Sequence, residues 1–157
     1  MISERSLFNP VAVLALAALI ACPSSARAGE FFEHDGIAIR GYDPVAYFTE
    51  GKPVKGTPAF NADYKGSTFH FSSMANRDAF VANATRYAPQ YGGFCAFGTA
   101  GGYKAAIQPS AFTVVDDKLY LNYNGDVQKQ WSRDIAGYVR AADRKWPEVS
   151  RQTKVVQ

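Results

Sequence analysis

The sequence predicts a single α+β domain in which small antiparallel β-hairpins pack against several short α-helices. Three observations lead to this fold class. Alternating apolar runs come in pairs joined by short polar turns, apolar stripes with helical spacing follow these pairs, and aromatic residues make up 14% of the chain. Large rings bury much area per residue, which helps a small domain without disulfides to build a sufficient core.

The first 28 residues have the pattern of a secretory signal peptide. An apolar run from Val11 to Ala21 precedes Ala26-Arg27-Ala28, a small-residue cleavage site. The run is too short for a membrane-spanning helix. We therefore expect export to the periplasm and cleavage after Ala28. The mature chain then consists of a domain over residues 29–149 and a polar C-terminal tail over residues 150–157.

A second interpretation of the same segment stays open. The run Leu19-Ile20-Ala21-Cys22 resembles the lipobox of bacterial lipoproteins, which would leave Cys22 lipidated at the new N-terminus. Pro23 directly after the cysteine is unfavourable for that processing. Membrane association is expected only if Cys22 is lipidated, and the domain works outside the cytoplasm in either case.

The N-terminal part of the domain begins with a strand and a short helix. The run Gly36–Arg40 predicts a strand, and Asp43 is a good N-cap for a helix that reaches Phe48. Pro44 fits the first helical position because its missing N–H would be unpaired there. Gly51 ends this helix.

A hairpin and a longer helix come next. The segments 59–64 and 67–71 alternate around Lys65-Gly66, which is typical of a hairpin, and Ser72 or Ser73 then caps a helix. Four apolar residues of this helix share one arc that we expect to face the core: Met74, Phe80, Val81 and Ala84.

Arg77 lies in the middle of this arc, and a charge inside an apolar stripe needs a partner. One interpretation is an aliphatic stem that packs while the guanidinium reaches the surface or a structural carboxylate. The other is an arginine that points into a pocket, where it holds an anionic ligand or orients an acid such as Asp43. The sequence leaves both open.

The C-terminal part of the domain again combines a hairpin with helices. A second hairpin is predicted over Phe112–Val115 and Lys118–Tyr123, around Asp116-Asp117. Two helices follow, the first with Val127 and Trp131 on one face and the second with a stripe from Ile135 to Trp146 that stops at Pro147. Residues from Ser150 onward are polar, and we expect them to fray.

Charge and motifs exclude several functional classes. The mature chain keeps 15 basic and 13 acidic residues, so neither sign dominates, and no basic stripe is interleaved with aromatics. Nucleic-acid binding is therefore not expected. The sequence contains no Gly-x-Ser-x-Gly elbow for a catalytic triad, and its glycine-rich run at residues 98–102 lacks the Lys-Ser/Thr pair of a phosphate loop.

Cys95 is the most informative residue, because it is the single cysteine of the predicted mature chain. A lone thiol in an oxidising compartment is either buried and inert or kept for chemistry. Glycines at positions 92, 93 and 98 let the backbone turn closely around it, and a helix beginning there would favour the thiolate. The alternatives are inert packing beside Phe94 and Phe97, metal binding, and redox chemistry.

The mature chain contains the ligand set of a blue-copper centre: Cys95, His34, His70 and Met74. These residues lie on separate elements, unlike the short ligand loop of cupredoxins. A looser site pairs Cys95 with His70 and adds Asp43 or Met74. The strand alternation argues against His70 as a ligand. It places His70 on the face opposite Phe69 and Phe71, and this face is then simply solvent-exposed.

Several segments carry a family resemblance. The run Tyr64–Ser73, followed by Phe80, Asn83 and Tyr87, resembles the YHS domain. The order of four further segments resembles that of exported bacterial YHS-domain proteins, some of which are selenoproteins: Gly41–Phe48, Tyr91–Phe97, Leu119–Tyr123 and Ala141–Pro147.

The wider YHS class implies metal handling and often has the pattern Phe-Cys-Ser after its aromatic strand. This chain has Ser72 and Ser73 after Phe71 instead, which puts the inherited metal site in doubt because a serine hydroxyl is a poor ligand for soft metals.

Two functions of different class follow. The first is a non-enzymatic periplasmic module that binds copper or zinc, or another small ligand, through Cys95 and His70. The second is a thiol-dependent redox enzyme with Cys95 as nucleophile, which would need an external thiol to complete each turnover. A purely structural or interaction domain is the remaining alternative, and the sequence names no protein partner.

Overall fold

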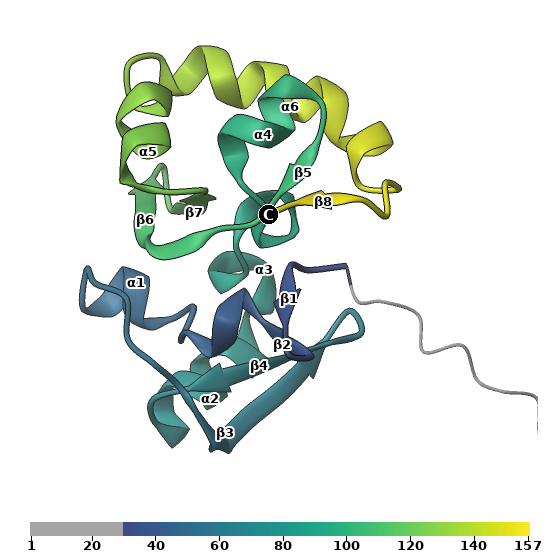
Figure 1. Cartoon of the computed structure of the whole chain (residues 1–157). Coiled ribbons are helices and arrows are strands. Elements are labelled where there is room, and N and C mark those ends of the chain that lie inside the picture. Colours follow the sequence, from purple (N-terminus) through teal and green to yellow (C-terminus); the bar gives the residue numbers. More distant parts are fainter. Residues whose placement is uncertain (1–29) are drawn as a thin grey trace, which may run out of the picture.

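The computed structural model describes residues 30–157, so the predicted signal peptide, its cleavage site and Cys22 lie outside the described residues. The fold is mixed α and β, as predicted, with short strands in small sheets and several helices (Figure 1). Its elements are β1 Glu33–His34, β2 Ile37–Ala38, α1 Ala46–Thr49, β3 Thr57–Tyr64, β4 Ser67–Phe71, α2 Met74–Ala82, α3 Ala84–Tyr87, α4 Ala96–Gly101, β5 Lys104–Ala105, β6 Gln108–Val115, β7 Lys118–Asn122, α5 Gly125–Trp131, α6 Ile135–Val149 and β8 Val155–Val156. Within this part of the chain, none of the helices is long and apolar enough to span a bilayer.

The first half of the fold is a four-stranded sheet with the order β1-β2-β4-β3. Strands β3 and β4 form the predicted antiparallel hairpin, and Lys65 and Gly66 both have a positive φ at its turn. Two successive residues with positive φ give the turn that matches the twist of a hairpin. Phe69 and Phe71 of β4 point into the core and are fully buried.

The second half contains the second predicted hairpin, β6 with β7, which turns at Asp116 and Asp117. Helices α4, α5 and α6 lie above this hairpin in Figure 1. Asn124 caps α5 and Asp134 caps α6 by accepting backbone N–H groups of their first turns.

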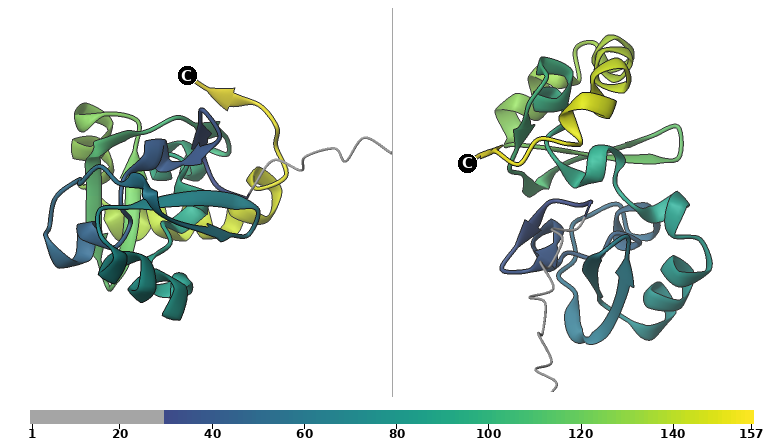
Figure 2. Two further views of the ribbon diagram at one scale, coloured as in Figure 1. Left: turned by 90° about the horizontal axis from the view of Figure 1, so that it is seen from below. Right: turned by 90° about the vertical axis from the view of Figure 1, so that its right-hand side faces the viewer.

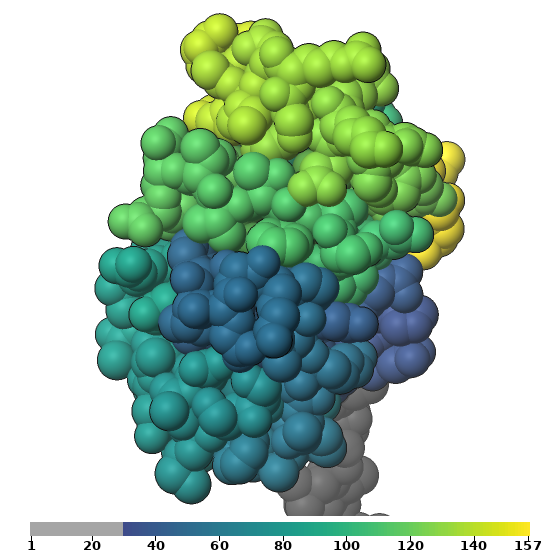
Figure 3. Space-filling model, turned by 90° about the vertical axis from the view of Figure 1, so that its left-hand side faces the viewer, coloured from purple at the N-terminus to yellow at the C-terminus, as the bar shows by residue number. Residues whose placement is uncertain are grey.

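The two halves share one core cluster. Rings from β4 and α2 pack there with aliphatic side chains of the second half, such as Leu119 and Leu121 of β7. The right-hand view of Figure 2 again shows the two halves one above the other, and on the face shown in Figure 3 the blue residues around α1 adjoin the green residues of the second half. The Tyr47 ring of α1 lies 4.8 Å from the Phe112 ring of β6. Tyr47 of α1 donates a hydrogen bond of 3.0 Å to the Pro109 carbonyl at this junction.

The predicted strand over Gly36–Arg40 is shorter in the structure. Strand β2 ends at Ala38 because Ile39, Arg40 and Gly41 have positive φ angles of 43°, 59° and 72° and form a left-handed turn. The turn directs the Ile39 amide to the Phe32 carbonyl at 2.8 Å. This contact places β1 against the rest of the sheet.

The predicted apolar arc of α2 is also wrong in part. Met74 and Val81 are 56% and 65% exposed, and only Phe80 is buried. Phe80 lies against three rings of the hairpin, Tyr64, Phe69 and Phe71, at centroid distances of 5.0 to 5.7 Å. The prediction is therefore wrong for Met74 and Val81, whereas Phe80 makes the main contact and Ala84, at the start of α3, packs against the same core.

The C-terminal end differs in two ways from the sequence-based expectation. Helix α6 continues past Pro147 to Val149, because a proline near the helix end removes only its own hydrogen bond and the Ser150 amide still bonds to the Trp146 carbonyl at 2.7 Å. The residues after it do not fray. Strand β8 pairs in parallel with β5, and Gln152 donates to the Gly102 carbonyl at 2.9 Å.

Candidate functional site

Cys95 lies at the start of α4, deep in the core. Cys95 is 1% exposed. Its sulfur accepts a hydrogen bond of 3.4 Å from the Gly98 amide, so the side chain acts as the N-cap of the helix. The thiol also lies 3.7 Å from the side-chain oxygen of Asn122, to which it donates. These polar contacts of the sulfur are made inside the protein.

Burial raises the pKa of the Cys95 thiol, and backbone hydrogen bonds from Gly98, Tyr123 and Phe97 oppose this effect only in part. The first turn of the helix does favour the thiolate, as expected, but the loss of hydration on burial destabilises the charged form by more and therefore decides the direction of the pKa shift. At neutral pH the side chain is a neutral thiol.

A left-handed turn places Cys95 at this position. Tyr91, Gly92 and Gly93 have φ angles of 53°, 59° and 71°, and a Cβ on Gly92 would lie 2.4 Å from the Glu30 carbonyl oxygen. Only glycine tolerates both this conformation and this contact. The prediction that residues without side chains shape the backbone here is confirmed, although the turn buries the sulfur.

His70 does not share the surroundings of Cys95. Its neighbours in β4, Phe69 and Phe71, point into the core that contains Cys95, so His70 points to the opposite face of the strand, where it is half-buried. Burial and the positive charge of Lys55 lower the pKa of this imidazole.

Met74 and Arg77 lie on α2, away from the core. Met74 is exposed, and the Arg77 guanidinium pairs with the adjacent Asp78 carboxylate at 2.7 Å. No group of three or more His, Cys, Asp and Glu side chains in residues 30–157 is arranged to hold a metal ion. The donor set expected from the sequence therefore does not fit a metal centre in the described part of the chain.

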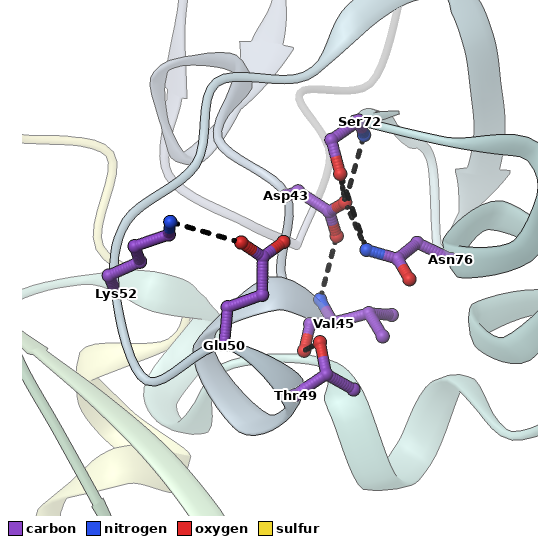
Figure 4. A network of polar contacts seen from close by, with 7 residues as sticks. All are labelled: Asp43, Val45, Thr49, Glu50, Lys52, Ser72 and Asn76. Carbon is purple, nitrogen blue, oxygen red and sulfur yellow. Dashed lines mark hydrogen bonds and ion pairs between the residues drawn. The ribbon is translucent and has the colours of Figure 1, made fainter.

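Asp43 is completely buried and forms the centre of a polar network (Figure 4). One carboxylate oxygen accepts from the Val45 and Ala46 amides at 2.9 and 3.3 Å, so Asp43 caps the turn that leads into α1, while the helix itself begins later than predicted, at Ala46. The other oxygen accepts from the Ser72 amide and hydroxyl and from the Asn76 side chain, at 2.7 to 2.8 Å. All five donors are neutral, and the network joins the start of α1 to α2 and to Ser72, the residue after β4.

An open groove of about 1190 Å³ runs between the two halves, on the side where β1 and β8 lie in Figure 1. Its apolar lining is mostly aromatic, from Phe31, Phe32, Phe94 and Trp146. The C-terminal segment from Ser150 to Val155 forms one wall of the groove, and the β3–β4 turn and the residues before β1 line it from the other half. Nine of its fifteen lining residues are polar or charged, so the groove combines aromatic rings with many polar groups.

Lys104 of β5 lines this groove and is only 9% exposed. Its ammonium group donates to the Ser150 carbonyl at 3.0 Å and lies 4.6 Å from the centre of the Phe94 ring. Burial lowers the pKa of the lysine. Within residues 30–157 no carboxylate lies within ion-pair distance of it, so its charge is compensated only by a carbonyl and a ring face.

Comparison with family models places part of this chain in a known class. Residues 45–91 match the model of the YHS domain. This segment is a YHS domain. No curated protein and no solved structure matched the chain.

The YHS domain runs from the start of α1 to the left-handed turn at Tyr91 and contains His70, Met74 and Arg77. Asp43 precedes it, whereas Cys95 and Lys104 follow it. The groove is therefore built largely from residues outside the YHS domain, namely those before β1 and those after Phe94.

Neither Lys104 nor the groove is predicted by a pattern in the sequence. Lys104 stands in a run without periodicity, and its burial depends on the C-terminal segment, which we expected to fray. One local pattern does indicate an ordered tail. Val155-Val156 is a β-branched pair, typical of a strand, at the end of an otherwise polar segment.

Proposed function

We propose that this chain is an exported, non-enzymatic binding module that holds a small ligand in the groove between its two halves. The single observation that supports this function is the aromatic groove of about 1190 Å³, lined by Phe94 and Trp146 and bounded by the C-terminal segment. A pocket of this kind gains affinity by removing apolar ligand surface from water.

The burial of Cys95 supports a binding role over a catalytic one. Cys95 is 1% exposed and burial raises the pKa of its thiol, so it lacks the thiolate that nucleophilic and redox thiol chemistry needs. The same burial gives the thiol a structural role as the cap of α4.

The two tryptophans of the chain allow a direct test. Trp146 lines the groove, while Trp131 is fully buried away from it and its indole N–H has no partner among the described residues. Trp131→Phe therefore leaves Trp146 as the single tryptophan and removes an unsatisfied donor.

Octanoate and octanamide are suitable probes because they have the same length and differ only in charge. We expect at least one of them to shift the Trp146 emission to the blue in Trp131→Phe and to raise the melting temperature by mass action. In the matched variant Trp146→Phe, the emission of Trp131 should not respond. If neither probe changes emission or melting temperature at millimolar concentration, the groove is not a binding site and the proposal fails.

Metal capture, which the YHS class implies, is the second candidate and has less support, since the described residues bring no three suitable ligands together. Zn²⁺ or Cu⁺ that binds the folded state through Cys95 would raise the melting temperature, and Cys95→Ser would abolish the shift. We expect no shift in either protein.

Export is supported by the signal-peptide pattern of the first 28 residues. The mass of the protein recovered from the periplasm should correspond to a chain that begins at Gly29. A mass that includes a lipid on Cys22 would support the lipoprotein alternative.

A further inference from the structure

We propose that the groove selects organic carboxylates with an apolar body, and that Lys104 is the residue that anchors the carboxylate. This inference rests on the proposed function and names its ligand class. It starts from a buried positive charge that lines a cavity and has no anionic partner within residues 30–157.

The surroundings of Lys104 leave part of its binding capacity unused. An ammonium group has three N–H donors, and one of them goes to the Ser150 carbonyl at 3.0 Å. The Phe94 ring, 4.6 Å away, stabilises the charge through its π face. Ser150 follows α6 directly, and the negative end of that helix dipole adds a partial charge only. A carboxylate would supply the full negative charge that neither group provides.

Of the other charged groups of the groove, only Lys65 and Glu30 form an ion pair within residues 30–157. Lys65 pairs with Glu30 at 3.0 Å, and Glu33 accepts a hydrogen bond from Ser67 at 2.6 Å. Arg151, on the C-terminal wall, has no ion-pair partner within the part of the chain that the structure describes. The two cations without carboxylate partners therefore belong to the same wall of the groove, where α6, β5 and the C-terminal segment meet.

The apolar body of the ligand has a matching surface. Phe94 lies directly beneath the ammonium group, and Phe32 packs on Phe94 with a centroid distance of 5.8 Å. Trp146 of α6 lines the same groove. An amphipathic anion would thus place its carboxylate on Lys104 and its apolar part on half-buried Trp146 and on the small exposed parts of Phe32 and Phe94, which are 3% and 5% exposed.

The decisive comparison uses octanoate and its neutral amide with the Trp131→Phe protein. We expect octanoate to bind about tenfold more tightly than octanamide. The ammonium group forms a stronger hydrogen bond with a charged carboxylate than with the neutral carbonyl of the amide. Equal affinities would overturn the carboxylate preference while leaving the binding function intact. Absence of binding by both probes would instead overturn the function.

Substitution of the lysine identifies the anchor. Lys104→Met keeps the apolar stem and removes the charge, so octanoate should lose about tenfold in affinity while octanamide is unchanged. Lys118→Met, at the exposed start of β7, is the matched control and should bind octanoate as the parent does. Unchanged octanoate affinity in folded Lys104→Met would exclude Lys104 as the anchor.

A third measurement keeps the test valid if Lys104→Met does not fold. Raising the ionic strength weakens charge interactions but not apolar contacts, so octanoate affinity of the Trp131→Phe protein should fall with salt and octanamide affinity should not. Affinities that respond equally to salt would overturn the inference.

Discussion

The side-chain oxygen of Asn122 lies 3.7 Å from the Cys95 sulfur and accepts a second hydrogen bond, of 3.2 Å, from the Phe97 amide. Asn122 is itself fully buried in β7. The amide thereby fixes the start of α4 to the second hairpin and gives the thiol a partner inside the core. Cys95 is thus held as a structural element of the junction.

The first prediction concerns the reactivity of this thiol. In a protein that begins at Gly29, Cys95 is the single cysteine, so an aromatic disulfide reagent reports on it alone. Because the sulfur is buried and protonated, we expect native protein to react at least roughly 100-fold more slowly than protein in denaturant. Equal rates would show that the thiol is accessible and would restore the redox hypothesis.

The second prediction is a loss of stability at alkaline pH that depends on Cys95. Burial raises the pKa of the thiol above its ordinary value of 9.0, so above this value the unfolded chain loses the proton first. The stability that the buried thiol contributes is complete below pH 9.0 and is lost as the pH rises towards the folded pKa, by at most about 1.4 kcal/mol per pH unit.

Denaturant unfolding of the parent protein and of Cys95→Ala, from neutral pH to pH 10, tests this contribution. The difference in free energy of unfolding between them should shrink above pH 9.0. Tyr47, Tyr91 and Tyr120 have raised pKa values and Lys104 a lowered one, but these groups are common to both proteins. A difference that does not change with pH would contradict the prediction.

The third prediction concerns Asp43 and its five donors. Asp43→Asn keeps the shape but replaces one acceptor oxygen by an NH₂ group that faces N–H or O–H donors. We expect the free energy of unfolding to fall by about 3 kcal/mol, because buried donors are left without partners. Asp63→Asn is the control, since Asp63 is exposed and accepts from Thr68 alone, and its cost should stay within about 0.5 kcal/mol.

The local patterns in the sequence predicted both hairpins and the Asp43 cap, because each depends on residues a few positions apart. The hairpin is indicated by the alternation around Lys65-Gly66. The cap is indicated by a carboxylate that lies two and three residues before the amides it binds. The YHS domain was likewise recognisable from its own residues.

The candidate site was harder to predict because its contacts are distant in sequence. The environment of Cys95 depends on Asn122, and that of Lys104 on Ser150, in segments 27 and 46 residues away. Strand alternation already placed His70 on the face opposite Phe69 and Phe71, but only the fold shows that Cys95 lies in the core with these rings and therefore apart from His70. The exposure of Met74 and Val81 likewise depends on the fold, because Phe80 is the residue of α2 that is buried against the hairpin.

The fourth prediction separates a strained backbone from a crowded one. Gly51 and Gly92 both have a positive φ, of 64° and 59°, but a Cβ on Gly51 would meet nothing within 4 Å, whereas one on Gly92 would lie 2.4 Å from the Glu30 carbonyl oxygen. Gly51→Ala should therefore cost about 1 kcal/mol, the price of the left-handed conformation alone. Gly92→Ala should cost about 3 kcal/mol or more, because the backbone before β1 must also move.

Urea unfolding of both variants measures these costs, and hydrogen exchange locates the change. The Phe32 amide, which bonds to the Gly92 carbonyl at 2.7 Å, should lose protection in Gly92→Ala and keep it in Gly51→Ala. Since Phe32 and Glu30 also line the groove, Gly92→Ala should weaken the binding of octanoate as well. Equal stability of the two variants would show that the close approach of Glu30 to the Tyr91–Gly93 turn is not the reason why position 92 requires glycine.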